Sequence, residues 1–490
     1  MINNAKYYPY GYIFSDEELS NIPDYYEKVL INRYYYYHDK NIDISIFEDD
    51  NKFIIIHGEF VHVGINDQMS KKEVTETLFN LYQEDYLQFL NLLDFIAGRF
   101  VIIIGDDNKV LVYPDATNTR STYYSENKNI LASHVFLIRD QLVYNRVAFS
   151  KALPDLTNGL ISTPFNQIKS VVPNYSLELF SKKYKRFFPR ENNKYTKLSE
   201  EEKFSLFERF WKKQLDFYLK KYKNFIFSIT GGGDSRFSLA LIKEHINEIQ
   251  FFTYATKEGI DNSSYAGKLL TLDYKIVKQM LNDINLNHKF IYFVDDKKQL
   301  SNEELNLLNK NTIGRHSSFL IPHIKENYNQ ENLKHIRGNL LEIGKTRYFN
   351  KQYKESNINE VKKIFDSQYR KAKDDKYNAL ADEMFADYID RLNYGVNIYD
   401  YHILDLYHWE VRMGRWHPEI LNTHDIIFDT ISPFNHRAMI EVSLSFSYEK
   451  RRDEYLFKEL INRNYSILNF YGDNTLKNLY EQKRDEKYEK

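Results

Sequence analysis

Two different hydrophobic patterns divide the chain. From about residue 52 to about residue 180, apolar residues come in short β-branched runs closed by turn residues, as at 53–56 and 100–104. Short runs of this kind between turn signals are typical of buried strands. The first half of the chain is therefore expected to form a β-rich domain, with strands buried on both faces between helices.

A turn-rich loop joins two of these runs. Residues 105–108, Gly-Asp-Asp-Asn, follow the run 100–104 and precede the run 110–113. Gly, Asp and Asn favour tight reversals of the backbone. The pattern predicts that the two runs form a β-hairpin.

Strand-like and helix-like segments alternate from residue 199 onward. Ser199 precedes three glutamates, so it is placed to cap a helix that runs to about residue 222. The next segments are predicted as strands at 225–229, 250–254 and 289–293 and helices at 237–246 and 274–284. This alternation indicates a parallel, doubly wound sheet. Beyond about residue 350 the chain is predicted to be mostly helical, with a frayed end.

The boundary between the two patterns is polar. Residues 182–198 are charged and interrupted by Pro189, which predicts a linker. A chain of 490 residues with 42% apolar content is long enough for more than one core. We therefore expect two domains, 1–190 and 199–490.

Charge and composition exclude several classes of protein. The 67 Lys plus Arg nearly balance the 69 Asp plus Glu, so no overall field attracts nucleic acid or an anionic membrane. No signal peptide is evident, and no apolar run approaches the roughly 20 residues of a membrane span. The expected location is cytoplasmic. The sequence holds no Cys, which excludes disulfides, thiolate metal sites and Cys nucleophiles. A homodimer is left open, because no motif reports the oligomeric state.

Three consecutive glycines carry the strongest chemical signal. Gly231, Gly232 and Gly233 lie between the strand predicted at 225–229 and a helix that begins near Asp234. Glycine amides can approach an anion because no Cβ intervenes. The start of the helix adds unpaired amides and a positive dipole end at the same point. The loop is therefore expected to bind phosphate.

The residues that flank these glycines extend the prediction. Thr230 and Ser235 supply hydroxyl donors. Asp234 beside a phosphate is repulsive unless a divalent cation such as Mg²⁺ bridges the two groups. The sequence thus predicts a joint pyrophosphate and metal site, in which the Asp234 carboxylate is unpaired when the metal is absent.

Other glycine-rich signatures fit less well. A dinucleotide fingerprint needs Gly at position 236, where Arg236 stands. A nucleotide-triphosphatase loop needs four residues between Gly338 and the Gly344-Lys345-Thr346 triplet, and five are present. An ordinary strand-to-helix turn stays open as an alternative, although it gives no reason for Thr, Asp and Ser around the glycines.

Residues 230–235, Thr-Gly-Gly-Gly-Asp-Ser, resemble the Ser-Gly-Gly-X-Asp-Ser loop of the asparagine synthetases and their β-lactam synthetase and lasso-peptide cyclase relatives. Residues 336–342 are similar to the second phosphate-side loop of that family, and 432–437 to its Pro-Phe-Leu-Asp segment. The resemblance implies an α/β doubly wound ATP pyrophosphatase domain, of the adenine nucleotide α-hydrolase type, with helical additions.

The amino-terminal half resembles the amidotransferase domain of the same family. The likeness rests on residues 93–100, Asp115, Tyr123 and 163–168. It implies an α+β Ntn-hydrolase-like sandwich. Family members that hydrolyse glutamine use a Cys at the mature amino terminus. Because the sequence has no Cys, and no Ser or Thr near Met1, the domain is expected to be structural or substrate-binding.

The resemblance also implies ligands and their residues. ATP and Mg²⁺ are the expected ligands. The nucleotide is expected on Ser228, Thr230, Gly231, Gly232, Gly233, Asp234, Ser235, Thr253 and Gly338. Mg²⁺ is expected on Asp234 and Glu342, the latter standing where the family has Asp. Lys345 joins these two acids as a catalytic candidate, while Lys458 and Lys477 are further candidates for the family's late Lys.

A ligase function follows as a hypothesis. A small-molecule or peptide carboxylate attacks the α-phosphorus of ATP, and an amine then displaces AMP to form an amide. Arg412 and Arg415 could orient the carboxylate, but an ion-paired structural helix is the favoured reading of these two residues. Three alternatives stay open: a nucleotide-binding pseudoenzyme, an ammonia-dependent amide synthetase and a tRNA-modifying enzyme.

Overall fold

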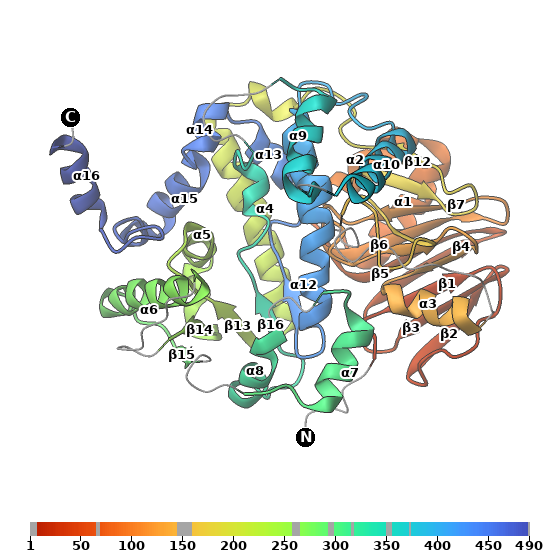
Figure 1. Cartoon of the computed structure of the whole chain (residues 1–490), viewed down its shortest axis with the longest axis horizontal. Helices are drawn as coiled ribbons and strands as arrows, with labels where there is room; N and C mark the ends of the chain where they lie inside the picture. Colours follow the sequence, from red (N-terminus) through yellow and green to blue (C-terminus); the bar gives the residue numbers. More distant parts are fainter. Residues whose placement is uncertain are drawn as a thin grey trace.

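The computed structural model describes residues 7–64, 69–144, 159–256, 265–292, 298–314, 318–348, 355–371 and 374–488. The protein is a mixed α/β structure with two antiparallel sheets and one parallel sheet. The antiparallel sheets belong to the amino-terminal half and the parallel sheet to the carboxy-terminal half, with long helices between them (Figure 1).

The two antiparallel sheets each have six strands. The first sheet, in spatial order, contains β10 (Ile168–Ser170), β8 (Tyr123–Ser125), β9 (Ile130–Ala132), β1 (Tyr12–Ser15), β3 (Tyr34–Asp39) and β2 (Tyr26–Ile31). The second contains β12 (Tyr184–Arg186), β11 (Tyr175–Glu178), β7 (Val110–Pro114), β6 (Ile96–Asp106), β5 (Lys52–His62) and β4 (Ile44–Asp49). The predicted hairpin is confirmed, since β6 and β7 pair antiparallel with Ile103 opposite Val112.

The strands of the second sheet are buried on both faces, but helices cover only one of them. Ile54 and Ile102 pack in one core with α1 (Lys71–Glu84) and α2 (Tyr86–Asp94). Ile55 and Ile103 pack in another core with the first sheet. The expectation of helices on both faces was therefore wrong, because successive side chains alternate between faces and one face meets a second sheet. On the outer side of the first sheet lies α3 (Val135–Tyr144).

The segment 182–198 is not a free linker. Strand β12 pairs with β11, Phe187 and Phe188 are each 2% exposed, and a 3-10 turn spans Lys194–Lys197. Apolar side chains of both halves belong to one continuous core. The polar composition of this segment predicted a linker. That prediction was wrong, because the contacts that bury the segment come from distant parts of the chain and leave no local pattern.

The third sheet is parallel and has the order β15-β14-β13-β16-β17. Its strands are β13 (Phe225–Ser228), β14 (Ile249–Ala255), β15 (His288–Tyr292), β16 (Lys334–Ile336) and β17 (Asp429–Ile431). The chain runs outward from β13 through β14 to β15 and then returns to β16 on the other side of β13. A topological switch point therefore lies between β13 and β16, and ligands of such sheets bind there, beyond the carboxyl ends of the strands.

Helices cover both faces of the parallel sheet. The helices between β13 and β16 are α5 (Gly233–Leu241), α6 (Tyr265–Asp283), α7 (Asn302–Asn311) and α8 (Ile321–Asn327). Phe227 packs with α5 and α6, whereas Ile226 packs with α8. Preceding them, α4 (Glu200–Lys221) starts with the predicted cap, because Ser199 and Glu202 bond reciprocally. The helix predicted at 237–246 starts earlier, at Gly233, and gives way to a 3-10 helix, Lys243–Glu248.

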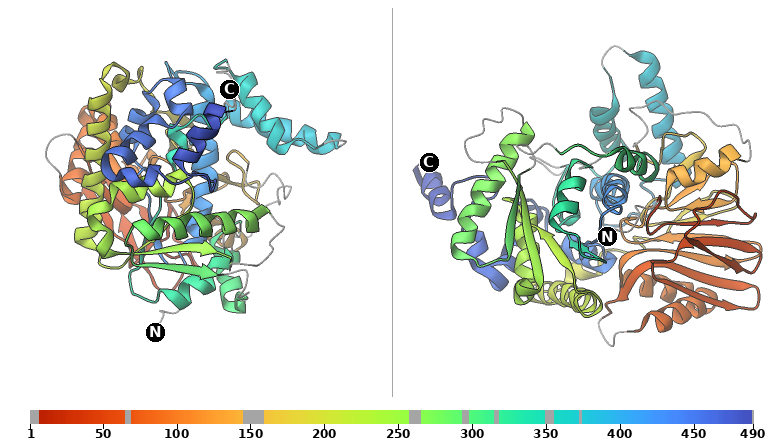
Figure 2. Two further views of the ribbon diagram at one scale, coloured as in Figure 1. Left: turned by 90° about the vertical axis from the view of Figure 1, so that its left-hand side faces the viewer. Right: turned by 90° about the horizontal axis from the view of Figure 1, so that it is seen from below.

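The rest of the chain is mostly helical, as predicted. It comprises α9 (Ile358–Tyr369), α10 (Asp375–Leu392), α11 (Ile403–Tyr407), a π-helical segment His408–Trp416, α12 (His417–His424), α13 (Arg437–Leu444), α14 (Tyr448–Arg452), α15 (Tyr455–Tyr465) and α16 (Leu479–Tyr488). Helices α9 and α10 project from the body (Figure 2), and α16 extends away from it (Figure 1). In the described part of the chain, no helix combines the length and the apolar character that a bilayer crossing requires.

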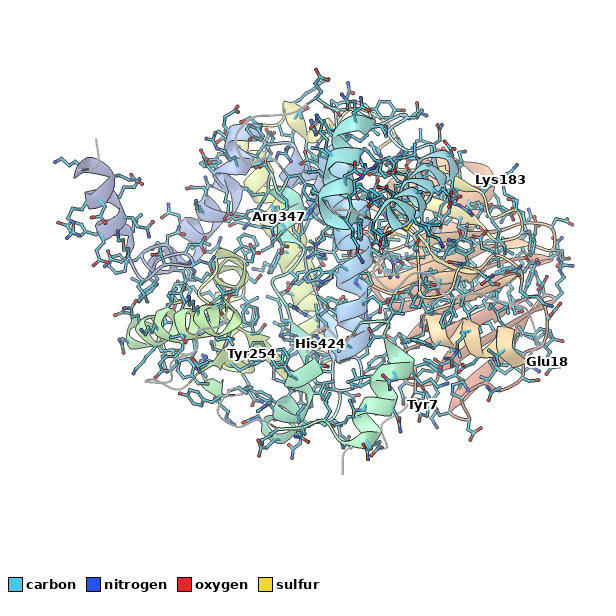
Figure 3. All side chains as sticks on the ribbon, viewed as in Figure 1. Tyr7, Glu18, Lys183, Tyr254, Arg347 and His424 are labelled. Carbon is cyan, nitrogen blue, oxygen red and sulfur yellow. The ribbon has the colours of Figure 1, made fainter. Side chains whose placement is uncertain are left out.

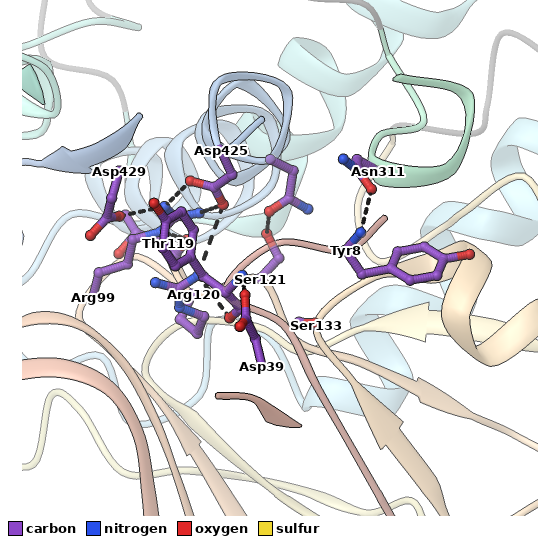
Figure 4. A network of polar contacts seen from close by, with 12 residues as sticks. Tyr8, Asp39, Arg99, Thr119, Arg120, Ser121, Ser133, Asn311, Asp425 and Asp429 are labelled. Carbon is purple, nitrogen blue, oxygen red and sulfur yellow. Dashed lines mark hydrogen bonds and ion pairs between the residues drawn. The ribbon is translucent and has the colours of Figure 1, made fainter. Parts of the chain in front are cut away.

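A buried ion-pair network joins the two halves (Figure 4). The guanidinium of Arg99, on β6, binds both carboxylate oxygens of Asp425 at 2.5 and 2.7 Å and reaches Asp429 at 3.1 Å. Lys334, on β16, binds Asp429 at 2.8 Å. These groups are each at most 7% exposed. The network fixes the parallel sheet against the antiparallel ones.

Candidate functional site

The triple-glycine loop lies at the switch point of the parallel sheet. It joins the carboxyl end of β13 to α5, and the helix begins at Gly233 with Gly232 as its N-cap. The cap makes no side-chain hydrogen bond, so the first amides of α5 are left for other acceptors. The loop therefore presents a positive helix end at the place where this class of sheet binds ligands.

Two carboxylates of the chain itself occupy the glycine amides. The N–H of Gly231 donates to Oδ1 of Asp273, on α6, at 2.7 Å. The N–H of Gly233 donates to Oδ1 of Asp473 at 3.0 Å. Asp473 lies between α15 and α16, so a carboxy-terminal segment closes over the loop. The geometry shows that these amides donate to anionic oxygens.

Hydroxyls and a guanidinium brace the same loop. Ser235 Oγ accepts from the N–H of Thr230 at 3.0 Å and lies 3.0 Å from Thr230 Oγ1. The N–H of Gly232 donates to Thr230 Oγ1 at 3.3 Å. Arg236 donates to the carbonyls of Gly231 and Tyr471 at 3.1 and 2.8 Å. These bonds hold the loop open around its amides and tie it to the carboxy-terminal segment.

Gly338 lets a second loop approach α5. A Cβ at this position would lie 2.7 Å from the carbonyl oxygen of Asp234 and 2.7 Å from Ser238 Oγ. Only glycine permits that distance without a shift of the backbone. The close approach brings the segment after β16, with Glu342 and Lys345, to the first turn of α5.

Lys345 is the cation at the centre of the site. Its Nζ lies 2.8 Å from Oδ1 of Asp234 and 3.0 Å from Oε1 of Glu454. Burial lowers the pKa of Lys345, but these two carboxylates outweigh it and raise the pKa overall. The expectation that the Asp234 carboxylate is unpaired without metal was therefore wrong. The fold supplies an ammonium group from a loop 111 residues away in sequence.

Glu342 places a second carboxylate beside Asp234. Burial and the neighbouring Asp234 raise the pKa of Glu342, and its Oε2 has no hydrogen-bond partner in the described part of the chain. Burial also raises the pKa of Asp234, against the effect of Lys345. Two adjacent carboxyls with an unused oxygen fit Mg²⁺, which commonly takes one or two carboxylates plus phosphate oxygens. The described residues include no cluster of three or more metal-binding side chains, so phosphate would have to complete such a site.

A pocket of about 400 Å³ opens beside the first turn of α5. Its lining includes Gly233 and Asp234 from the loop, Glu454 and Phe457 from the region of α15, and Asp473 from the carboxy-terminal segment. The glycine loop therefore borders an open space of the size that small ligands occupy.

The two other lysine candidates lie farther from the centre of the site. Lys458 lines the same pocket, and its Nζ donates to the carbonyl of Asp453 at 2.9 Å. Lys477 forms an ion pair with Asp485 at 2.7 Å. Neither approaches Asp234 as Lys345 does.

Ser228 and Thr253 form hydrogen bonds within the sheet. Ser228 Oγ lies 3.0 Å from His335 Nε2 on β16. Thr253 Oγ1 donates to the carbonyl of Ile229 at 2.8 Å and lies 2.8 Å from His288 Nε2. Burial lowers the pKa of His288 to about 4, so this ring is neutral at pH 7.

The two arginines weighed as carboxylate ligands lie elsewhere. Arg415 is 4% exposed, binds Tyr123 Oη and the carbonyl of Ser162 at 3.1 and 2.9 Å, and lies 3.5 Å from Glu419. Arg412 is exposed and stacks on Trp416. For Arg415 this confirms the reading of an ion-paired structural residue.

Several residues of the site have no signal in the sequence. Glu454 and Asp473 lie outside every recognised motif, and both reach the loop only through the fold, as does Asp273. Contacts between distant segments leave no local pattern, so sequence reasoning missed these residues.

The comparisons with known proteins add little. No protein-family model and no curated protein sequence matches the chain. Among solved structures, the glutamine phosphoribosylpyrophosphate amidotransferase from B. subtilis, complexed with ADP and GMP, is similar at 11% identity and a TM-score of 0.22, over 67% of this chain and 75% of that one. A structure described as the allosteric regulatory enzyme of purine biosynthesis is similar at 11% identity and a TM-score of 0.23, over 54% of this chain and 63% of that one. Likenesses at these TM-scores carry no argument about fold or function.

Proposed function

We propose that the protein is an ATP-dependent carbon–nitrogen ligase that forms AMP. It activates a carboxylate as an acyl adenylate, releases pyrophosphate and transfers the acyl group to an amine. The observation that carries the proposal is the position of the triple-glycine loop: it lies at the switch point of a parallel sheet, with Asp234, Glu342 and Lys345 beside it. Amides, a helix start and a lysine are the groups that stabilise a departing pyrophosphate.

The layers and the strand order support a finer assignment of both domains. Two antiparallel sheets packed face to face, with helices outside, agree with an Ntn-hydrolase-like domain over about residues 1–190. The strand order of the parallel sheet agrees with an ATP pyrophosphatase domain over about residues 199–490. The first domain would then be a degenerate amidotransferase domain, because the sequence has no Cys to attack glutamine.

The glycine loop and the charged side chains beside it have separate roles in this reaction. The amides of residues 231–233 bind the phosphates once Asp273 and Asp473 release them. Lys345 offsets the charge that grows on the leaving pyrophosphate. Mg²⁺, held by Asp234 and Glu342 together with phosphate oxygens, would supply further positive charge there. The amine comes from a second substrate or from the same molecule, and both substrates are small molecules or peptides.

Exchange of labelled pyrophosphate into ATP tests the proposal. The exchange should depend on an added carboxylate substrate and should be lost in Glu342→Gln. Asp453→Asn, on an exposed carboxylate, is the matched control and should exchange like the parent protein. Absence of exchange with a broad panel of carboxylic acids and amino acids would sink the ligase assignment.

A nucleotide-binding protein without turnover is the second candidate. It is favoured by one observation: Asp273 and Asp473 already occupy the amides of Gly231 and Gly233. Such a protein would bind ATP in a calorimeter and show no exchange. An ammonia-dependent amide synthetase would instead show exchange and form product with ammonium alone.

A further inference from the structure

The chain folds back onto the glycine loop after α15. Residues 466–488, which we call the carboxy-terminal arm, comprise a 3-10 turn (Ser466–Asn469), a tip at residues 472–478 and helix α16. At the tip, the N–H of Asn474 donates to the carbonyl of Gly231 at 3.1 Å. The neighbouring Asp473 accepts from the N–H of Gly233 at 3.0 Å. The tip therefore binds both a carbonyl and an amide of the loop.

Asp473 takes the position that an anionic ligand takes at a helix start. Gly233 is the first residue of α5, and its N-cap, Gly232, offers no side chain to the free amides. A carboxylate at this place is stabilised by the positive end of the helix, as a phosphate oxygen would be. Asp473 belongs to the protein itself, so it occupies the loop when no ligand is bound.

Acidic neighbours oppose this contact. Asp234 and Glu454 line the same pocket as Asp473. Burial raises the pKa of Asp234, and the charges of Glu454 and Asp473 raise it further, against the effect of Lys345. Arg236 lies 3.4 Å from Asp473 and offsets part of the repulsion. The Asp473 side chain is 42% exposed, so solvent screens its contacts and the tip is weakly held.

The base of the arm is anchored separately from its tip. The Arg236 guanidinium donates to the carbonyls of Leu468 and Tyr471 at 3.0 and 2.8 Å, and both of these side chains are buried. The N–H of Leu479 donates to the carbonyl of Phe470 at 2.7 Å and closes the loop that carries the tip. The tip can therefore leave the glycine loop while its base stays docked.

The rest of the arm is largely exposed. Helix α16 extends away from the body in Figure 1, and in Figure 3 its side chains radiate from the ribbon. One face of α16 borders the pocket beside α5, through Leu479, Gln482, Lys483 and Glu486. Large apolar side chains of the arm are exposed: Ile467, Phe470, Leu476, Leu479 and Tyr480. Segments with so few buried apolar contacts open locally at low cost in free energy.

We propose that the carboxy-terminal arm is an autoinhibitory element of the phosphate site, with the Asp473 carboxylate in the place of a phosphate oxygen. The inference rests on the phosphate-binding part of the proposed function and adds its regulation. In the closed state the tip occupies the amide of Gly233 and covers Gly232, whose Cβ would lie 3.7 Å from the Asn474 side-chain amide. Pyrophosphate or ATP with Mg²⁺ binds the open state and shifts the arm toward it, and the tip returns when the ligand leaves.

Hydrogen exchange on the full chain tests the movement. Inorganic pyrophosphate with Mg²⁺ is the probe, because it needs neither an acyl substrate nor turnover. We expect the amide hydrogen of Asn474 to exchange about tenfold faster when the probe saturates the site, since its bond to Gly231 is then lost. The amide of Leu479 is the internal control, because its bond to Phe470 lies within the arm. Unchanged hydrogen exchange at Asn474, in a protein that binds pyrophosphate, would overturn the inference.

Substitution of Asp473 tests the competition. Asp473→Ala should speed hydrogen exchange at Asn474 without any ligand. It should also bind pyrophosphate about threefold more tightly, because the helix end is then free. Asp485→Asn is the matched control: this acid lies on the same arm, but its ion pairs are with Lys477 and Arg484 of the arm itself. Equal or weaker pyrophosphate binding by Asp473→Ala would show that the carboxylate does not compete, and the inference would be wrong.

The outcomes separate the arm from the ligase assignment. A tip that opens on pyrophosphate, in a protein that never incorporates labelled pyrophosphate into ATP, would retain the autoinhibition and reject the ligase. Carboxylate-dependent incorporation at equal rates in the parent protein and Asp473→Ala, with no opening at Asn474, would retain the ligase and reject the autoinhibition. If neither protein binds pyrophosphate, the inference falls together with the phosphate site.

Discussion

Lys345 Nζ lies 2.8 Å from Oδ1 of Asp234 and so places a fixed positive charge at the first turn of α5. The same ammonium group reaches Glu454 at 3.0 Å. With Glu342 adjacent to Asp234, the site contains more carboxylates than cations. Lys345 therefore balances part of this negative charge and leaves the rest for a divalent cation.

Replacing Lys345 should make the protein depend on divalent cations. Lys345→Gln leaves Asp234, Glu342 and Glu454 without their cation, and we expect a loss of about 2 kcal/mol in the free energy of unfolding. Mg²⁺ should restore more of this stability in the variant than it adds to the parent protein. Thermal unfolding with and without Mg²⁺ measures both effects. The exposed Lys72→Gln serves as the control, and equal Mg²⁺ effects in all three proteins would contradict the prediction.

Removing the charge of Asp473 should strengthen nucleotide binding. The Asp473 carboxylate accepts a hydrogen bond from the N–H of Gly233 at the positive end of α5. In that position it competes with phosphate. Asp473→Asn is expected to bind ATP about threefold to tenfold more tightly, since a helix end contributes roughly 1 kcal/mol to a charged partner. Calorimetric titration of ATP with Mg²⁺ measures the change. Asp453→Asn is the matched control, and weaker ATP binding in Asp473→Asn would show that this carboxylate assists the nucleotide.

Two glycines of the site should respond differently to alanine. A Cβ at Gly338 would lie 2.7 Å from the backbone of Asp234, so Gly338→Ala should destabilise the fold by about 1–3 kcal/mol. A Cβ at Gly232 would meet nothing closer than 3.5 Å, and its φ of −87° suits alanine. Gly232→Ala should therefore fold normally and lose ATP affinity, because the methyl group fills the space of the phosphates. Chemical denaturation and ATP titration on both variants separate the two effects, and normal ATP binding by Gly232→Ala would place the phosphates elsewhere.

Glu441 should make stability depend on pH. Burial raises the pKa of Glu441 from 4.5 to about 7, and Tyr401 donates to its carboxyl at 2.8 Å. The folded state then holds the proton more tightly than the unfolded state, so this group's contribution to stability is lost as pH rises from about 4.5 to about 7. The free energy of unfolding falls by roughly 3 kcal/mol over this pH range.

The pH effect is isolated by one substitution. Glu441→Gln should unfold with a free energy that varies less over that pH window, as measured by denaturant titrations at several pH values. Glu449→Gln, on an exposed carboxyl, should behave like the parent protein. Parallel pH profiles for the parent and Glu441→Gln would contradict the prediction.

The Arg99 and Asp425 pair should couple the two halves of the chain. Both residues are buried, at 5% and 4% exposure. Asp425→Asn leaves the Arg99 guanidinium with Asp429 as its remaining acid. We expect the free energy of unfolding to fall by about 3 kcal/mol. Calorimetric scans should then show the antiparallel and parallel sheets unfolding at separated temperatures. A single unshifted transition would show that the network does not hold the halves together.

The local part of the site could be predicted from the sequence. The apolar run predicted β13, the three glycines predicted the loop, and the residues after them predicted α5. Each of these elements depends on residues that are adjacent in the chain. The Ser199 cap and the hairpin of β6 and β7 were predictable for the same reason. The absence of Cys from the sequence also excluded a Cys nucleophile without any structure.

Only the tertiary structure decided which groups meet at that loop. Asp473 contacts Gly233 from 240 residues away, and Lys345 contacts Asp234 from 111 residues away. Arg337 contacts His424 from 87 residues away. Such pairs follow from the order of strands in the sheet, which brings distant loops to one edge, and the sheet order depends on the burial of the whole core rather than on any local pattern.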